Sequence, residues 1–277
     1  MSNRGPIALH GGGEYLPGDE PFLLACLVAG RLAAVTRWAA QVAPCNEEAT
    51  DGRPVRGEAP DPRPGEVRVA VVPAAAAGGR PDLAAAHGIA AFRRVAATAG
   101  IPIRVEAVMI VDPAGAAAPG PAGRLAGMDL IHLPGGNPGR LLEILEGSAA
   151  WRAIFAAHER GAVVAGASAG AMVLADWTWT PGGWRRGLGL VPGLVLVPHA
   201  ERVARGGWTG TFGASVPSEA EPIGRLGLDE RTGVLSETRP DGAIAWRVVG
   251  PGRAHWSPAR AIPPLSASHG TALDLDP

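Results

Sequence analysis

The sequence predicts an α/β fold: a mostly parallel central sheet flanked by helices, with a small antiparallel extension near the C-terminal end. Apolar runs of strand length alternate with segments of helix length, a pattern typical of parallel α/β sheets. The strand-like runs are almost continuous in valine, isoleucine and leucine, as expected of strands buried on both faces. A chain of 277 residues can bury one large core, which favours one domain over two.

The expected strands of the central sheet are Ile7–His10, Val67–Val72, Ile103–Val111, Leu130–Leu133, Val163–Ala165 and Leu194–Val197. The expected helices between them are Phe22–Ala34, Pro81–Ala99, Pro138–Leu145 and Ala149–Arg160. Pro81 fits the second of these helices because a first helical turn tolerates proline. After His199 the apolar runs become short and are separated by Gly/Asp turns, which predicts the antiparallel extension; these runs are Gly233–Ser236, Ala243–Val249 and Ala254–Trp256.

Two segments lack the apolar residues that a packed element needs. Cys45–Glu66 is rich in proline, glycine, arginine and glutamate, which indicates a surface insertion. Residues 258–277 are expected to form a loosely ordered tail. The remaining residues, 1–257, are expected to form one α/β domain that carries the insertion.

The overall charge excludes several classes of function. The formal net charge of −1 gives no reason to expect nucleic acid or an anionic membrane surface as a partner. All 25 basic residues are arginine, so Ser–Lys catalysis, a Schiff base and a Walker-type phosphate lysine are excluded.

The cysteines and the N-terminal region indicate a cytoplasmic protein without a metal site. Cys26 and Cys45 stand in no recognisable pattern, which suggests a reducing compartment and offers no cysteine ligand set for a metal. The first residues run directly into a strand-like segment, where a secretory signal would need a longer apolar stretch. The apolar run from Pro21 to Val35 is short for a bilayer span and is interrupted by Arg31, so we expect a buried helix there.

Ser168 is the candidate nucleophile. It lies in Gly166-Ala167-Ser168-Ala169-Gly170, between a strand-like run and a helix-like run. A sharp strand–turn–helix connection lifts the hydroxyl clear of the sheet and aims free N–H groups of the helix at the group it attacks. Small neighbours are required because a large side chain would collide with the strand or the helix.

His199 is the expected general base, because a serine hydroxyl needs a base to accept its proton. It ends the strand-like run Leu194–Val197, and sites in α/β sheets assemble at the carboxyl ends of strands. His10 also ends a strand and is the second choice. His132 lies within a strand and is expected to be a core histidine.

The acid that orients the base has two candidates. Glu201 follows His199 by two residues, so the two side chains share a face if the backbone is extended. Glu230 is the alternative, because the pair Asp229-Glu230 ends a short apolar stretch. Asp176 follows Ser168 by about two helical turns and is too distant to help directly.

Two glycine turns are expected to line the substrate site. Pro134 to Gly139 follows the fourth strand, and Gly11 to Glu14 follows the first. Such turns leave N–H groups free and let a substrate approach closely, and the Ala169 N–H should be one oxyanion donor. The expected substrate-binding residues are Gly12, Gly13, Glu14, Gly135 and Asn137. A nucleotide site is the alternative, but neither turn has the dinucleotide or Walker spacing.

These motifs occur in a fixed order, and together they resemble a known family. The order is Gly-Gly-Gly-Glu, Leu-Pro-Gly-Gly-Asn, Gly-Ala-Ser-Ala-Gly-Ala and Val-Pro-His. The chain resembles the S51 serine peptidases, the group of dipeptidase E and cyanophycinase, whose flavodoxin-like fold is that of class I glutamine amidotransferases. The resemblance runs from Ile7 to Leu235. It implies that Ser168 is the nucleophile, that His199 is the base, and that Gly136 and Ala169 donate to the oxyanion.

The resemblance supports one candidate for the acid and argues against two substrates. His199-Ala200-Glu201 is similar to the His-x-Glu pair of amidotransferases, which supports Glu201. Cyanophycinases place an acid and a glutamine before this histidine, where the chain has Val197-Pro198, so cyanophycin is not favoured. Dipeptidase E has an acid between the serine and the histidine, where this chain offers only Asp176. Amidotransferases have a cysteine at the elbow, which speaks against glutamine hydrolysis.

Tryptophans and arginines surround the expected site in the sequence. The tryptophans are Trp177, Trp179, Trp184 and Trp208, and the arginines among them are Arg185, Arg186, Arg202 and Arg205. Such a set would suit a short peptide with a free carboxylate. Core tryptophans and solvated arginines are the favoured alternative.

We therefore expect a serine-type hydrolase that cleaves a short peptide or related amide through an acyl-enzyme at Ser168. Two alternatives stay open: a catalytically silent protein that binds a small molecule or partner in the same cleft, and an esterase with the same groups. The expected partner is a small peptide-like substrate, with no nucleic acid, membrane or cofactor, and a homodimer is allowed for.

Overall fold

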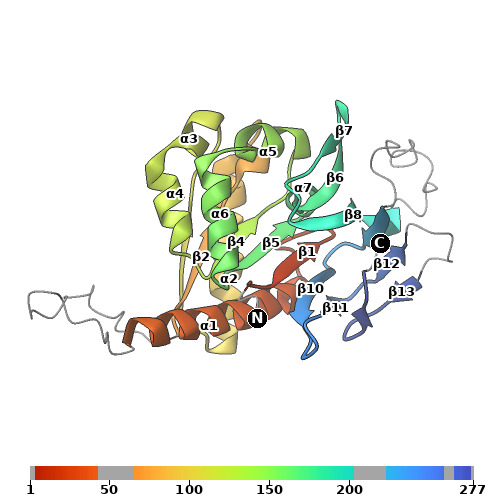
Figure 1. The fold of residues 1–277 in the computed structure, drawn as a ribbon, viewed down its shortest axis with the longest axis horizontal. Coiled ribbons are helices and arrows are strands. Elements are labelled where there is room, and N and C mark those ends of the chain that lie inside the picture. The colour runs from red at the N-terminus through yellow and green to blue at the C-terminus, as the bar shows by residue number, and fades with distance from the viewer. Residues whose placement is uncertain (1–3, 43–64, 203–222, 259–264, 276–277) are drawn as a thin grey trace, which may run out of the picture.

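The structure is a computed structural model that describes residues 4–42, 65–202, 223–258 and 265–275. Figure 1 shows two sheets beside each other, the first flanked by helices and the second forming the C-terminal side of the molecule. The α/β class expected from the sequence is therefore confirmed, and so is the antiparallel extension.

The first sheet has eight strands in the order β14-β11-β10-β1-β5-β4-β2-β3. Its parallel part consists of β1 (Ile7–His10), β2 (Val67–Val71), β3 (Ile103–Ala107), β4 (Leu130–Leu133) and β5 (Val163–Ala167). Its antiparallel part consists of β10 (Gly233–Thr238), β11 (Ile244–Val249) and β14 (Ala272–Leu273). Since β1, β5 and β4 are neighbours and parallel, the turns that follow them meet at one edge of the sheet.

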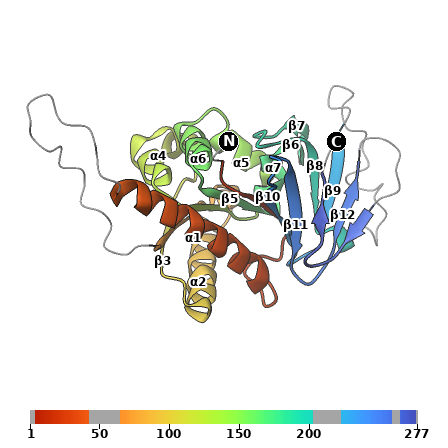
Figure 2. The same cartoon turned by 60° about the horizontal axis from the view of Figure 1, so that its bottom comes forward.

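Helices cover both faces of this sheet (Figure 2). One face carries α1 (Glu20–Val42) and α2 (Pro81–Ala99), whose Phe22, Leu27 and Phe92 are buried in one apolar cluster. The other face carries α3 (Pro113–Ala117), α4 (Pro119–Ala126), α5 (Pro138–Leu145) and α6 (Ala149–Glu159). Each face therefore has its own core, as expected of strands that are buried on both sides.

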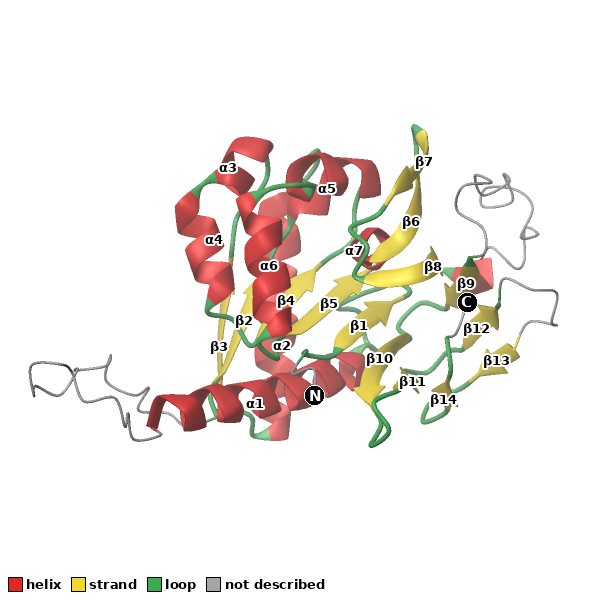
Figure 3. Ribbon diagram, viewed as in Figure 1, coloured by secondary structure: helices red, strands yellow, loops and turns green. Residues whose placement is uncertain are grey.

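The second sheet has six strands in the order β13-β12-β9-β8-β6-β7. They are β6 (Ala175–Thr180), β7 (Gly183–Arg186), β8 (Val191–Pro198), β9 (Gly224–Leu228), β12 (Ala254–Ser257) and β13 (Leu265–Ala267). In Figure 3 most helices lie beside the first sheet, whereas only short helical segments lie beside the second sheet. Leu196, Leu226 and Trp256 of the second sheet join the same buried cluster as Val234 and Trp246 of the first.

The second sheet corrects one expectation from the sequence. The run Leu194–Val197 was assigned to the central sheet, but it lies in β8, where it pairs in parallel with β6 and β9. The Trp- and Thr-rich strand β6, which follows the short helix α7 (Ala169–Leu174), is the nearest partner for β8 in the chain.

The described part of the expected tail, residues 258 and 265–275, contains two short strands. β13 pairs with β12, and β14 pairs with β11, so this end of the chain extends both sheets. β13 and β14 contain the apolar residues Leu265, Ala267 and Leu273. These residues are too few to give a clear strand pattern in the sequence. The expected insertion, Cys45–Glu66, lies outside the described residues except for its last two, and Glu66 is buried beside β2.

Most other elements agree with the sequence within a few residues. β3 is four residues shorter than expected, because Ile110 N–H donates to the Val108 carbonyl at 2.9 Å in a turn after the strand. α1 is longer than the expected Phe22–Ala34. By length and composition alone, its segment Glu20–Ala39 could cross a membrane, with a mean hydropathy of 1.5. In the structure α1 packs against the first sheet with Phe22, Leu23 and Leu27 in the core, and 33% of the apolar segment is buried.

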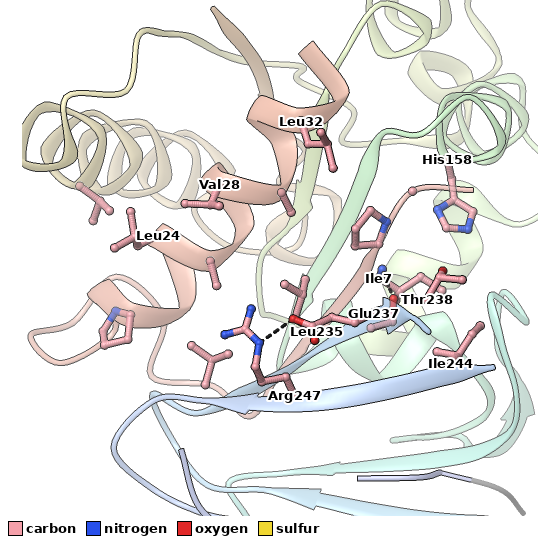
Figure 4. A pocket seen from close by; sticks show the side chains of 18 of the residues that line it. Ile7, Leu24, Val28, Leu32, His158, Leu235, Glu237, Thr238, Ile244 and Arg247 are labelled. Atoms are coloured by element: carbon pink, nitrogen blue, oxygen red, sulfur yellow. Dashed lines mark hydrogen bonds and ion pairs between the residues drawn. The ribbon is translucent and has the colours of Figure 1, made fainter. Parts of the chain in front are cut away.

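A wide groove runs between α1 and the strands β10 and β11 (Figure 4). Its volume is about 1680 Å³, and aliphatic side chains such as Leu24, Val28 and Ile244 line it. Arg247 and Glu237 form an ion pair of 2.6 Å on its wall. The groove also includes Ile7 and the residues before it, so it lies at the opposite end of β1 from the turn that begins at Gly11.

Candidate active site

Ser168 occupies a strained turn between β5 and α7. Its backbone has φ 47° and ψ −113°, a conformation that non-glycine residues rarely adopt. The Ser168 N–H donates to the His10 carbonyl at 2.9 Å, and the Ser168 carbonyl accepts from the Met172 N–H at 2.9 Å. A β-carbon on Gly170 would overlap the Leu133 carbonyl, so the small neighbour is required as the sequence suggested. The turn is therefore a nucleophile elbow in its geometry.

His199 lies within hydrogen-bond distance of the serine. Its Nε2 is 3.2 Å from Ser168 Oγ, and the histidine follows directly after β8 with φ 52°. The His199 N–H donates to the Gly11 carbonyl at 2.8 Å, which ties the second sheet to the turn after β1. A β-carbon on Gly12 would overlap the imidazole ring, so only glycine lets the ring pack this closely. The imidazole is 32% exposed and thus open to a substrate.

Glu230 is the carboxylate that contacts this histidine. Its Oε1 lies 2.7 Å from His199 Nδ1, and its side chain is 16% exposed. The arrangement follows from the second sheet, because β8 and β9 are parallel neighbours with Pro198 opposite Leu228. The residues after the two strands therefore meet. With the Nδ1 proton donated to Glu230, the Nε2 lone pair faces the serine hydroxyl.

Glu201, the first choice from the sequence, is placed elsewhere. Its Oε2 accepts from the Glu230 N–H at 3.0 Å, so it supports the backbone of Glu230 rather than His199. The sequence argument required an extended backbone. Instead, His199 has a positive φ and a helical turn begins at Ala200, so residues two apart do not share a face.

Arg202 is a charged neighbour of Glu230, a contact that the sequence argument did not predict. Its Nη2 lies 2.7 Å from Glu230 Oε1, the same oxygen that contacts His199. The guanidinium is 68% exposed, so solvent screens this ion pair. The contact between Arg202 and Glu230 could be predicted only from the parallel pairing of β8 and β9, which brings the residues after the two strands together.

The two glycine turns meet at Ser168. Glu14 Oε1 accepts from the Gly135 N–H at 2.7 Å. A β-carbon on Gly135 would lie 2.6 Å from that oxygen and 3.3 Å from Ser168 Cβ, so the carboxylate and the serine flank one position. Gly13 lies against Glu230, since a β-carbon there would be 3.3 Å from Glu230 Cβ. Four predicted residues, Gly12, Gly13, Glu14 and Gly135, thus lie around the Ser168–His199–Glu230 set.

Two backbone N–H groups remain as candidate oxyanion donors. Ala169 N–H begins α7 next to the nucleophile, and Gly136 N–H follows the contact between Gly135 and Glu14. Neither donates to an acceptor in the described part of the chain. Gly136 has φ 147°, and a β-carbon there would overlap the Ala75 carbonyl, so this turn requires glycine.

The side-chain oxygen of Asn137 is engaged in a helix cap. Its side-chain oxygen accepts from the Arg140 N–H at 3.0 Å and caps the N-terminus of α5. Its own N–H donates to the Ala75 carbonyl at 2.8 Å. The predicted substrate contact of Asn137 is therefore left to its side-chain amide nitrogen.

The other candidate histidines are buried behind these turns. His10, the second choice as base, is fully buried, and its Nδ1 accepts from the Gly12 N–H at 3.2 Å. His132 contacts the Tyr15 hydroxyl through Nδ1 at 2.9 Å. Burial lowers the pKa of His132 to about 3, and burial raises the pKa of Tyr15. The Tyr15 hydroxyl therefore donates to a neutral His132, which is the core histidine that the sequence suggested.

Part of the tryptophan and arginine set lies in the hairpin of β6 and β7, namely Trp177, Trp179, Trp184, Arg185 and Arg186. Trp177 is buried, and the Arg186 guanidinium lies 4.7 Å from the centre of its ring. Arg186 also pairs with Asp176 at 3.1 Å. These contacts fit the structural alternative for Trp177 and Arg186. Trp208 and Arg205 lie outside the described residues.

Among the described residues, no group of three or more His, Cys, Asp or Glu side chains is placed to hold a metal ion.

Solved structures of other proteins share the fold of this chain. The crystal structure of a peptidase from an acI-B1 actinobacterium is similar with a TM-score of 0.67. The match is 21% identical and covers 98% of this chain and 96% of that one, which shows a common fold. The crystal structure of a putative peptidase E protein from Listeria monocytogenes EGD-e gives a TM-score of 0.46 at 12% identity, over 92% and 98% of the two chains.

No curated protein matches the sequence significantly. The sequence model of peptidase family S51 matches residues 65–207, just over half of the chain. The match includes the elbow, the glycine turn after β4 and His199. The chain therefore belongs to peptidase family S51.

Proposed function

We propose that this peptidase-family protein is a serine-type hydrolase that cleaves a short peptide or related amide through an acyl-enzyme at Ser168. The observation that carries the proposal is the contact chain of Ser168 Oγ, His199 and Glu230, with distances of 3.2 Å and 2.7 Å. A nucleophile, a base and an orienting acid in hydrogen-bond contact are what acyl transfer by serine requires.

The reaction begins with transfer of the serine proton. His199 Nε2 accepts the proton from Ser168 Oγ as the oxygen attacks the substrate carbonyl carbon. Glu230 accepts the Nδ1 hydrogen bond and stabilises the imidazolium that forms. His199 then donates the proton to the leaving amine, and the acyl group stays on Ser168. A water molecule that gives its proton to His199 hydrolyses the ester and frees the serine.

The tetrahedral intermediates need donors for their negative oxygen. Ala169 N–H and Gly136 N–H fill this role in the proposal, because neither has an acceptor among the described residues. One such donor contributes on the order of 3 kcal/mol to the stabilisation of the transition state. Glu14 supports the second donor indirectly, since it holds the neighbouring Gly135 N–H.

The proposal is tested by the time course of amide hydrolysis. Purified protein is mixed with short peptides and with matched peptide anilides, and product release is followed from the first turnover. An acyl-enzyme predicts product release that depends on Ser168, with a burst close to one equivalent where deacylation is slow. Ser168→Ala should release no product above the uncatalysed rate.

A folded wild type that cleaves none of these substrates and reacts with no serine-directed probe would contradict the proposal. That result would favour the binding protein. Paired esters and amides of the same acyl group separate the peptidase from the esterase, because only a peptidase turns over the amide at a useful rate.

A further inference from the structure

We infer that His10 and Asp19 form a buried positioning pair that holds Gly12, and through Gly12 the ring of His199, in the reactive arrangement. The inference rests on the proposed function of Ser168 and His199. It assigns no chemical step to His10, which has no contact with the serine side chain among the described hydrogen bonds.

His10 contacts both halves of the proposed machinery. Its backbone carbonyl accepts the Ser168 N–H at 2.9 Å, which fixes the elbow. Its Nδ1 accepts the Gly12 N–H at 3.2 Å. Gly12 in turn lies directly under the His199 ring, and its carbonyl accepts from the Arg231 N–H at 2.7 Å. A shift of Gly12 would therefore move the surface on which the base rests.

Asp19 lies beside the other ring nitrogen of His10. The acceptor role of Nδ1 requires the ring hydrogen on Nε2. Nε2 lies 2.8 Å from Asp19 Oδ1, an ion-pair contact that lacks hydrogen-bond geometry, and a carboxylate at this distance electrostatically favours a hydrogen on Nε2. Both side chains are at most 1% exposed, so solvent does not compete. The other oxygen, Oδ2, accepts from the Tyr15 N–H at 2.7 Å. Asp19 is thus the carboxylate that favours the His10 tautomer able to accept from Gly12.

The buried pair resembles the proposed triad in having a carboxylate beside one ring nitrogen of a histidine. In the triad, Glu230 accepts a hydrogen bond from Nδ1, so that Nε2 can accept from the serine. In the buried pair, the Asp19 carboxylate favours the hydrogen on Nε2 through its charge, so that Nδ1 can accept from a backbone N–H. An ordinary core histidine would need only satisfied ring nitrogens, whereas this arrangement requires one particular tautomer.

Asp19→Asn tests the tautomer with little change in shape. The Tyr15 N–H needs an oxygen acceptor, so the amide oxygen should replace Oδ2 and the NH₂ group should face His10 Nε2. His10 then carries its hydrogen on Nδ1 and cannot accept from Gly12. We expect the rate of Ser168 labelling by a fluorophosphonate probe to fall about 10- to 100-fold per folded molecule, as for a displaced catalytic group.

His10→Asn and Tyr15→Phe are the matched controls. An asparagine oxygen at residue 10 can reach the position of Nδ1 and accept from Gly12, so its labelling rate should stay within about threefold of wild type. Tyr15→Phe removes a buried hydrogen bond to His132 but none to Gly12. It should lower thermal stability by an amount similar to Asp19→Asn and leave labelling unchanged.

Equal labelling rates for Asp19→Asn, Tyr15→Phe and wild type, each corrected for the folded fraction, would overturn the inference. Where His10→Asn does not fold, the comparison of Asp19→Asn with Tyr15→Phe decides alone. An unlabelled wild type would instead refute the proposed function, so the two failures are distinguishable. For slow peptide turnover, the inference also predicts a lower kcat with an unchanged KM, because Gly12 acts on the base.

Discussion

The candidate active site, at the edge of the sheet where the turns after its strands meet, and the groove beside α1 differ in almost every property. The edge is a small polar site where turns from both sheets meet around Ser168, His199 and Glu230. The groove has a volume of about 1680 Å³, and none of these three residues lines it. The comparison teaches that a candidate active site is recognised by the convergence of polar groups rather than by the size of a cavity.

Backbone strain separates the two regions as well. Ser168, His199 and Arg231 all have positive φ, and all three lie at or next to the edge. The groove-lining Leu24 and Val28 belong to a regular helix. Strained residues persist only where surrounding contacts hold them, and such sites are commonly functional. Substitutions at the edge should therefore affect turnover, whereas substitutions in the groove should not.

Ser168→Ala gives the largest expected effect. Loss of the hydroxyl removes the acyl-enzyme, so kcat/KM for a cleaved peptide should fall by at least about 10⁴-fold. The melting temperature should change little, because among the described residues the hydroxyl has a hydrogen bond with His199 alone. A variant that keeps a tenth of the activity would show that the edge is not the reactive region.

Glu230→Gln should be the second most severe change. Removal of the carboxylate leaves the wrong His199 tautomer available, with an expected loss of about 10²- to 10⁴-fold in kcat. Glu201→Gln is the matched control, because its side-chain oxygen can still accept from the Glu230 N–H; its loss should be below about tenfold. Steady-state kinetics on both variants checks this order, and a larger loss at Glu201 would reverse the assignment.

Gly12→Ala should reduce turnover by about 10²-fold. The new methyl group would occupy the volume of the His199 ring and push the base away from the serine. Gly120→Ala is a suitable control, since a β-carbon there meets nothing within 4 Å. Unchanged kcat in Gly12→Ala would mean that the contact with Gly12 does not set the position of His199.

His132 predicts a pH dependence of stability rather than of activity. Its pKa is lowered from 6.5 to about 3 because the ring is buried. Between these values the unfolded chain binds a proton that the folded chain does not. The free energy of unfolding should therefore fall as the pH drops from 6.5 toward 3, by at most about 1.4 kcal/mol per pH unit from this residue.

Urea denaturation of wild type and His132→Asn at pH 7 and pH 5 measures this contribution. Asparagine keeps an acceptor for Tyr15 but does not titrate, so the variant should lose less stability between the two pH values. The same loss in both proteins would show that His132 is not responsible for the acid sensitivity.

Val28→Ser in the groove should have the smallest effect. The side chain is 57% exposed in the middle of α1, so stability should change by no more than about 0.5 kcal/mol. Peptide turnover should stay at the wild-type level. A tenfold loss of kcat/KM would break the contrast, because the groove would then contribute to the reaction.

The sequence predicted the first sheet and its edge well, because the information there is local. Strand runs such as Val163–Ala167 are continuous and apolar, and the small residues around Ser168 leave few alternatives. It also named both acids, but it ranked Glu201 first by proximity in the chain. The structural choice of Glu230 depends on the parallel pairing of β8 with β9, which no local pattern encodes.

The second sheet and the buried pair were missed for related reasons. β6 is rich in tryptophan and threonine, and β13 and β14 are only three and two residues long, so their apolar patterns are weak. His10 was expected to compete as a base because it ends a strand. Its proposed role toward Gly12 depends on Asp19. The Asp19 carboxylate reaches the His10 ring only in the folded chain.

Site-resolved labelling tests the central claim most directly, namely that His199 activates the hydroxyl of Ser168. The protein is treated with a fluorophosphonate, and the modified residue and its rate are determined by mass spectrometry for wild type and His199→Ala. The account predicts a single adduct on Ser168 in wild type and a rate at least about 10³-fold lower without the imidazole. A folded wild type without an adduct, or equal rates in the two proteins, would contradict it.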